Sequence, residues 1–151
     1  MLLIIGFLFM VFFTVVMGIL TSAWNAFFDL PSIMLMIVSL LFFFPSTKSG
    51  KIIGRYFKTS LNKDSAYTGA ELASLCAAVK STIKFILAVG GLGIVSGLIG
   101  SLTNLENKNA LGPNVALSLL SFFYAITISF FIFFPVQAWA ENKMNSLQND
   151  A

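Results

Sequence analysis

Four apolar stretches alternate along this chain with short polar segments. These stretches are Met1 to Ser22, Pro31 to Pro45, Ile83 to Leu102 and Leu111 to Pro135. A helix rises about 1.5 Å per residue and the hydrocarbon layer is roughly 30 Å thick, so about 20 residues cross it. Pro31 to Pro45 is short for a crossing unless Ala26 to Leu30 extend it. The pattern predicts an all-α integral membrane protein with four transmembrane helices.

Residues 1–45 are expected to hold the first two of these helices. The first apolar run is longer than the apolar core of a typical signal peptide, and no basic residue precedes it. We therefore expect a retained first helix. Trp24 lies in the brief connector, where an indole ring suits the headgroup level.

Residues 46–82 form a short basic segment, in which we expect a helix. Thr68-Gly-Ala-Glu71 matches a capping box, where the hydroxyl and the carboxylate satisfy the first free N–H groups of a helix. From Leu72 to Ile83 apolar residues recur at helical spacing. The helix is therefore expected to run unbroken into the third span.

The third and fourth spans, within residues 83–136, carry small residues at helical spacing. Gly93 and Gly97 form a pattern that lets another backbone approach closely. The fourth span has a small, weakly polar face that comprises Ser118, Ser121, Ala125 and Ser129. Such a face either packs against another helix or lines a polar path, and the sequence leaves both interpretations open.

Two proline positions mark the expected ends of the fourth span. Pro113, after Gly112, suits the first turn of a helix, where its missing N–H costs nothing. Pro135 stands at the far end of the apolar run.

Composition and charge agree with a membrane protein and predict its orientation. Hydrophobic residues make up 58% of the chain and charged residues 10%, against about 25% charged in a soluble domain. Seven of the nine Lys and Arg residues lie between the second span and the start of the third. By the positive-inside rule, both termini, residues 46–82 and the tail 137–151 are cytoplasmic.

The residue types exclude several kinds of chemistry. There is no histidine and one cysteine, Cys76, so neither an internal disulfide nor a His/Cys metal site can form. No carboxylate lies inside a span, although secondary transporters and proton pumps use one for coupling. No nucleophile–base pair and no phosphate-binding loop is present. We expect no enzyme, metal or cofactor and no self-sufficient transporter, with Cys76 as a buried structural residue.

Three motifs of the last two spans follow a recognisable order. They are Gly93-Ile-Val-Ser-Gly97-Leu-Ile-Gly100, then Leu111-Gly-Pro-Asn-Val-Ala-Leu-Ser-Leu-Leu-Ser121, then Tyr124 with Pro135 eleven positions on. This order resembles the MotA/TolQ/ExbB family of ion-driven motor subunits, and the four-span layout resembles its flagellar-stator MotA branch. Phe27-Phe-Asp-Leu-Pro-Ser-Ile33 is similar to the family's entry to its second span.

The resemblance implies a homo-pentamer in the bacterial inner membrane, built around two copies of a single-span partner of the MotB/ExbD/TolR kind. That partner would supply the intramembrane Asp, and ion flow would drive rotation of the pentamer around the dimer. The lipid bilayer is the other expected partner, and a nucleic acid is not one.

The resemblance also implies which residues form the ion path. The third and fourth spans would line the pore, and the pore-lining positions would be Gly97, Ser118, Ser121, Tyr124 and Ala125. Ser121 would lie nearest the ion, with Gly97 opposite it and Tyr124 one turn further along. Helix packing would involve Gly93, Gly100 and Pro135.

Two features depart from the family pattern. The MotA branch has a large cytoplasmic domain that engages the flagellar rotor, and residues 46–82 replace it here, with Lys51, Arg55 and Lys58 as the expected cytoplasmic contacts. Sodium-type members carry threonines where this chain has Gly97, Ser121 and Phe122. Because hard cations need several oxygen ligands, we expect the ion to be H+.

A non-conducting four-span scaffold is the alternative function. It would assemble or anchor a larger complex through its basic segment and would need neither a pore nor a partner Asp. The sequence leaves open which process a motor would drive: flagellar rotation, gliding, outer-membrane energisation or secretion.

Overall fold

The structure is a computed structural model that describes residues 2–21, 30–60, 67–103, 105–106 and 108–149. The described residues fold almost entirely into helices, as predicted, and they contain no β-strand. The helices are α1 (Leu2–Thr21), α2 (Leu30–Thr47), α3 (Ser49–Ser60), α4 (Gly69–Thr103), α5 (Lys108–Ile128), the π-helical turn η2 (Ser129–Phe133) and α6 (Phe134–Asn149). Trp24 and the first three residues of the Phe27–Ile33 motif lie outside the described residues.

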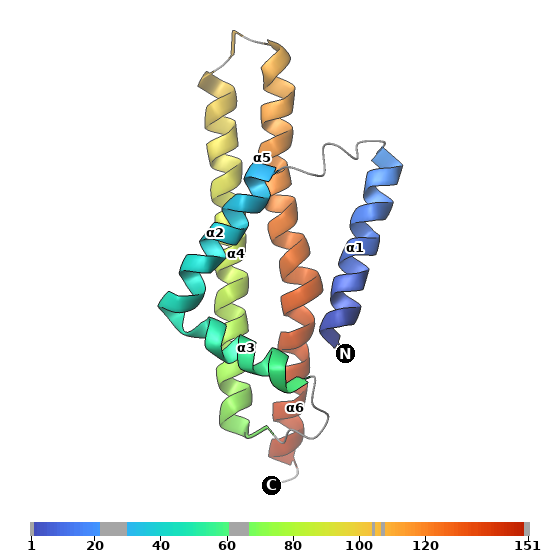
Figure 1. The fold of residues 1–151 in the computed structure, drawn as a ribbon, viewed down its shortest axis with the longest axis vertical. Coiled ribbons are helices and arrows are strands. Elements are labelled where there is room, and N and C mark those ends of the chain that lie inside the picture. Colours follow the sequence, from blue (N-terminus) through green and yellow to red (C-terminus); the bar gives the residue numbers. More distant parts are fainter. Residues whose placement is uncertain (1, 22–29, 61–66, 104, 107, 150–151) are drawn as a thin grey trace.

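The frame of the molecule is a long antiparallel pair of helices (Figure 1). One member is α4, and the other is the continuous rod formed by α5, η2 and α6. Helix α2 runs obliquely across this pair, α3 lies crosswise to it near the C-terminal end, and α1 packs along the rod beside η2 and α6.

Three helical segments of the described residues are long and apolar enough to cross a membrane. They are Leu30–Thr47, Gly69–Thr103 and Leu111–Asn149. Helix α2 is therefore a candidate for the second predicted span. It begins at Leu30, one residue before Pro31, and it continues past Pro45 to Thr47. The first predicted span is an uncharged helix of 20 residues, of which Leu8–Leu20 forms a shorter apolar segment. A fourth crossing by α1 stays a prediction.

Helix α4 begins and continues as the capping box predicts. Glu71 N–H donates to the Thr68 hydroxyl at 3.4 Å, and Thr68 N–H donates to the Glu71 carboxylate at 3.2 Å. These reciprocal bonds satisfy backbone donors that the first turn leaves free. The helix then runs for 35 residues without a break.

The candidate fourth span begins at Leu111, as predicted, but the helix that contains it begins earlier. Helix α5 starts at Lys108, so Pro113 lies inside the helix and not in its first turn. In a helix Pro113 deprives the carbonyl of Asn109 of its donor. Asn109 and Pro113 are both exposed, so solvent can satisfy that carbonyl.

The rod does not end at Pro135, contrary to the prediction. In a regular α-helix the proline ring would collide with the carbonyl of Phe131, and its nitrogen has no hydrogen to donate. The chain widens into a π turn just before Pro135, where Phe134 N–H donates to the carbonyl of Ser129 five residues back. This wider turn accommodates the proline, and α6 continues to Asn149.

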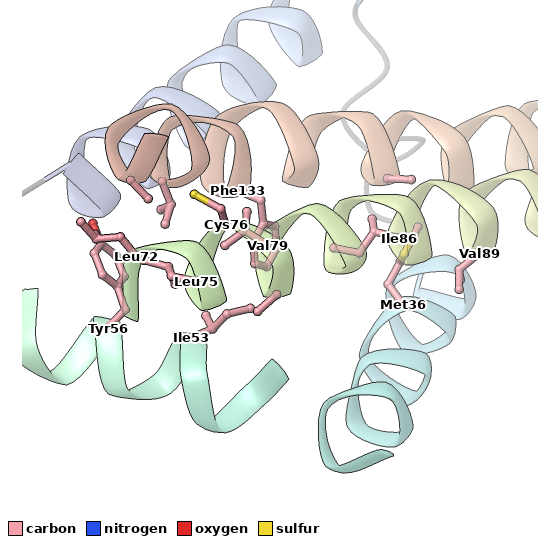
Figure 2. Packing of buried hydrophobic residues seen from close by; sticks show 14 residues of the cluster. Met36, Ile53, Tyr56, Leu72, Leu75, Cys76, Val79, Ile86, Val89 and Phe133 are labelled. Carbon is pink, nitrogen blue, oxygen red and sulfur yellow. The ribbon is translucent and has the colours of Figure 1, made fainter. Parts of the chain in front are cut away.

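The apolar core is largest at the end of the bundle that holds α3 and α6 (Figure 2). Ile53 and Tyr56 of α3 pack there with the buried face of α4, which presents Leu72, Leu75, Cys76 and Val79. Cys76 is a buried free cysteine, as expected, and its burial raises the pKa of the thiol. This core therefore holds α3, which lies in the basic segment, against α4 and α6.

Candidate functional site

The small residues of α4 and α5 meet in one seam. A Cβ built on Gly93 would lie 2.5 Å from the Cβ of Ser121, and one built on Gly90 would lie 2.5 Å from the Cβ of Ala125. Gly97 and Ser118 approach even more closely. Real Cβ atoms essentially never come this near, so only glycine allows this backbone approach. We call these six residues the α4–α5 seam.

The register of the seam differs from the expected one by one helical turn. The sequence interpretation placed Gly97 opposite Ser121, whereas the structure pairs Gly93 with Ser121 and Gly97 with Ser118. The helices are antiparallel, so each turn forward along α5 meets the preceding turn of α4. The Gly93-xxx-Gly97 pattern thus does bring a second backbone close to α4, and this backbone belongs to α5 of the same chain.

The hydroxyl groups of the seam are buried and hydrogen-bonded. The Ser121 hydroxyl lies 2.7 Å from the Ser32 hydroxyl of α2, and the Ser118 hydroxyl donates to the Val115 carbonyl at 2.7 Å. Ser118, Ser121 and Ala125 are at most 5% exposed. Within the single chain, the small face of α5 therefore serves helix packing and does not line a polar path. Ser32 connects α2 to the same face.

Tyr124 lies away from the seam. It lines an apolar groove of about 340 Å³ between α1, α2 and α5, together with Thr14, Met36 and Thr127. The groove presents almost no polar surface. The structure therefore does not bring Tyr124 together with Ser121 on one polar path within the chain.

Two residues predicted to serve helix packing have different surroundings. A Cβ built on Gly100 would meet nothing within 4 Å, so the closing of α4 onto α5 does not depend on it. Pro135 follows the π turn, where Gly6 of α1 sits directly against the carbonyl of Phe131. This is the carbonyl that Pro135 leaves without its usual donor. No sequence signal marks Gly6 as its neighbour.

The predicted cytoplasmic contacts lie together on α3. Lys51, Arg55 and Lys58 are all exposed and follow one another at helical spacing. Arg55 lies 3.5 Å from the Glu71 carboxylate at the start of α4. The Thr68 hydrogen bonds, with a smaller contribution from Arg55, hold the pKa of Glu71 below its usual range.

An ion pair that the sequence interpretation missed connects α4 with α6. Lys80 Nζ lies 2.7 Å from Glu141 Oε1, and the Gln137 amide donates to the same oxygen at 3.2 Å. The hydrogen bond with Lys80 lowers the pKa of Glu141 and raises that of Lys80. Opposite charges just beyond the ends of two antiparallel spans were the available signal.

The seam has hydroxyl groups but no group that can hold a proton near neutral pH. The described part of the chain contains no cluster of three or more His, Cys, Asp or Glu side chains. From residue 85 to residue 105 and from 109 to 140 the sequence has no charged residue. The chain itself therefore places no Asp, Glu, Lys or Arg side chain at the depth of the seam.

Comparison with known proteins identifies a family for this chain. The model of the MotA/TolQ/ExbB proton channel family matches residues 47–151, which include all six residues of the α4–α5 seam. The chain is 29% identical over 79 residues to "Chemotaxis protein PomA" of Vibrio alginolyticus, a match that covers 52% of this chain and 31% of that protein. It is 36% identical over 63 residues to "Uncharacterized protein YtxD" of Bacillus subtilis (strain 168), covering 42% and 23%. The chain thus matches less than a third of the length of either relative.

Proposed function

The chain belongs to the MotA/TolQ/ExbB proton channel family, and from this premise we propose that it is the pore-forming subunit of a proton-driven rotary motor complex. The complex has five copies of this chain around two copies of a single-span partner that carries an intramembrane Asp. It resides in the bacterial inner membrane, with both termini of this chain in the cytoplasm.

The observation that carries this proposal is a well-packed pair of spans with no charged residue from 85 to 105 or from 109 to 140. Gly93 and Gly97 close α4 against α5, and the buried hydroxyls form hydrogen bonds within the chain. A proton crossing the bilayer needs an acceptor at this depth, because bare charge is costly there. The partner Asp supplies that acceptor, and this chain supplies the wall around it.

The seam gives a physical role to the proposed pore residues that it contains, which exclude Tyr124. Ser118, Ser121 and Ala125 set the distance between α4 and α5. They would therefore determine the shape of the pore wall without facing the pore themselves. The face of α4 turned away from the seam offers exposed Val95, Ser96 and Ile99 to neighbouring chains. Ser121 stays the seam residue that we place nearest the proton path, and its buried hydroxyl is hydrogen-bonded to Ser32 of α2.

Native mass spectrometry tests the assembly. The full chain is co-expressed with the product of the adjacent gene and released in a mild detergent. Five copies with two of a single-span, Asp-containing protein are expected. A monomer, dimer or tetramer that never retains such a protein would contradict the motor assignment.

Proton flux separates the motor subunit from the scaffold alternative. The scaffold is favoured by one observation, that the small face is fully used for packing inside the chain. Proteoliposomes that contain the complex are energised with a potassium diffusion potential, and internal pH is followed with a dye. Proton uptake that disappears when the partner Asp is changed to Asn supports the motor, whereas a complex that never conducts supports the scaffold.

A further inference from the structure

Helix α3 has an exposed face that carries only positive charge. Its twelve residues, Ser49–Ser60, include Lys51, Arg55 and Lys58 and no acidic residue. Spacings of four and three residues put these cations on one side of the helix. The opposite side is occupied, because Ile53 is 5% and Tyr56 is 4% exposed in the core with α4.

The position of α3 brings this face to the edge of the bilayer. Helix α2 is a candidate span that ends at Thr47, and α3 starts two residues later. Lys48 between them adopts a left-handed backbone conformation, with φ at 58°, and this turns the chain. Helix α3 then lies crosswise to the α4–α5 pair (Figure 1), which is the orientation of a helix that lies along a membrane surface.

The cations of this face differ in how they are engaged. Arg55 is bound to Glu71 at 3.5 Å. Lys51 and Lys58 extend from the turns on either side of it, and Phe57 beside Lys58 is 40% exposed. The ammonium groups of Lys51 and Lys58 can reach lipid phosphates, while the exposed ring of Phe57 can contact the apolar region beneath them. This combination is typical of a helix at a membrane surface.

We propose that α3 is an interfacial helix that binds the headgroups of anionic phospholipids in the cytoplasmic leaflet through Lys51 and Lys58, with Phe57 at the acyl boundary. A lipid fits this surface better than a protein does. A helix of this length spans about 18 Å, and its single exposed stripe is far smaller than the roughly 800 Å² that a stable protein interface buries on each side. Because the proposal rests on α3 alone, it does not depend on the motor assignment.

Lipid titration with native mass spectrometry tests this proposal on the full chain in a non-ionic detergent. Dioleoyl-phosphatidylglycerol is compared with dioleoyl-phosphatidylcholine, for the unaltered chain and for Lys51→Gln/Lys58→Gln. Phosphatidylglycerol is expected to bind more tightly than phosphatidylcholine. The double variant should lose that preference, with affinity for phosphatidylglycerol reduced roughly thirty-fold, the factor that two lysines supply at an anionic surface.

Matched variants separate a site from general charge. Lys143→Gln removes an exposed cation from α6 and should leave the preference intact, whereas Lys51→Arg/Lys58→Arg should retain it. Equal binding of the two lipids, or an equal loss with Lys143→Gln, would overturn the proposal. Unchanged lipid affinity in Lys51→Gln/Lys58→Gln would also overturn the proposal, and α3 would then be tested as a protein contact. The melting temperature of this double variant should match that of the unaltered chain, which shows that it is folded.

Discussion

The hydroxyl oxygens of Ser32 and Ser121 lie 2.7 Å apart, although 89 positions separate them in the chain. Both residues are buried, at 5% exposure each. Their hydrogen bond joins α2 to the α4–α5 seam at the level where Gly93 meets Ser121. Three helices are thereby fixed to one another at a single small polar junction.

The strength of this junction can be measured with a double-mutant cycle. Ser32→Ala and Ser121→Ala should each lower the free energy of unfolding by about 1 kcal/mol, with a coupling energy of about 0.6 kcal/mol, the average for hydrogen bonds between membrane helices. The measurement is unfolding of the full chain in mixed micelles with increasing SDS. Strictly additive effects of the two substitutions would show that the hydroxyls do not interact.

Glycine substitutions along α4 should divide into two classes. Gly93→Ala and Gly97→Ala place a methyl group where Ser121 and Ser118 already lie, so each should destabilise the chain by about 1–3 kcal/mol through overpacking. Gly91→Ala and Gly100→Ala are matched controls, because a Cβ there would meet nothing within 4 Å. Melting temperatures in detergent measure the difference, and equal losses at all four positions would contradict the seam.

Helix α1 should depend on Gly6 for its position. A side chain at Gly6 would overlap the carbonyl of Phe131, so Gly6→Val should push α1 off the π turn while the α4–α6 core stays folded. The readout is disulfide formation between Phe9→Cys and Phe131→Cys in a Cys76→Ala background, since the two rings have centroids 5.4 Å apart.

The Gly6→Val variant should lower the rate of that crosslink at least tenfold. Leu8→Ala, at a residue that is 61% exposed, is the control and should leave the rate unchanged. Rapid crosslinking in Gly6→Val would show that α1 does not rest on this carbonyl.

Stability should fall in acid through two carboxylates at the α3 end of the bundle. The pKa values of Glu71 and Glu141 are lowered in the folded chain below the ordinary value of 4.5. The stability that this contributes is therefore present above about pH 4.5 and is lost as the pH falls through the lowered values. Because the side chains of Glu71 and Glu141 are 42% and 37% exposed, solvent screens their interactions and the effect should be small.

The measurement is the melting temperature between about pH 7 and about pH 3, where acid should lower it. Glu141→Gln should flatten this dependence, and so should Lys80→Gln, which removes the largest cause of the lowered pKa of Glu141. Lys84→Gln, at an exposed lysine one turn further along α4, is the control. An unchanged acid dependence in Glu141→Gln would argue against the ion pair.

The sequence by itself determined the helices, because these depend on local terms. Hydropathy marks α2, α4 and α5, and the Thr68–Glu71 capping box specifies the start of α4 through bonds between residues three apart. The family, too, was evident from the motifs of the last two spans, and its match to residues 47–151 confirms it.

The tertiary structure decided how those helices face one another. Hydropathy does not determine how a membrane helix is rotated about its axis or in which register it pairs with its neighbour, because lipid is as apolar as a neighbouring helix. Only packing therefore pairs Gly93 with Ser121, turns the small face of α5 toward α4 and leaves open the space that a Cβ at Gly100 would occupy. The π turn at Ser129–Phe133 likewise arises because the rod continues past Pro135 and must bring α6 back onto α4. Contacts between residues far apart in the chain set these features, and a pattern along one chain does not encode them.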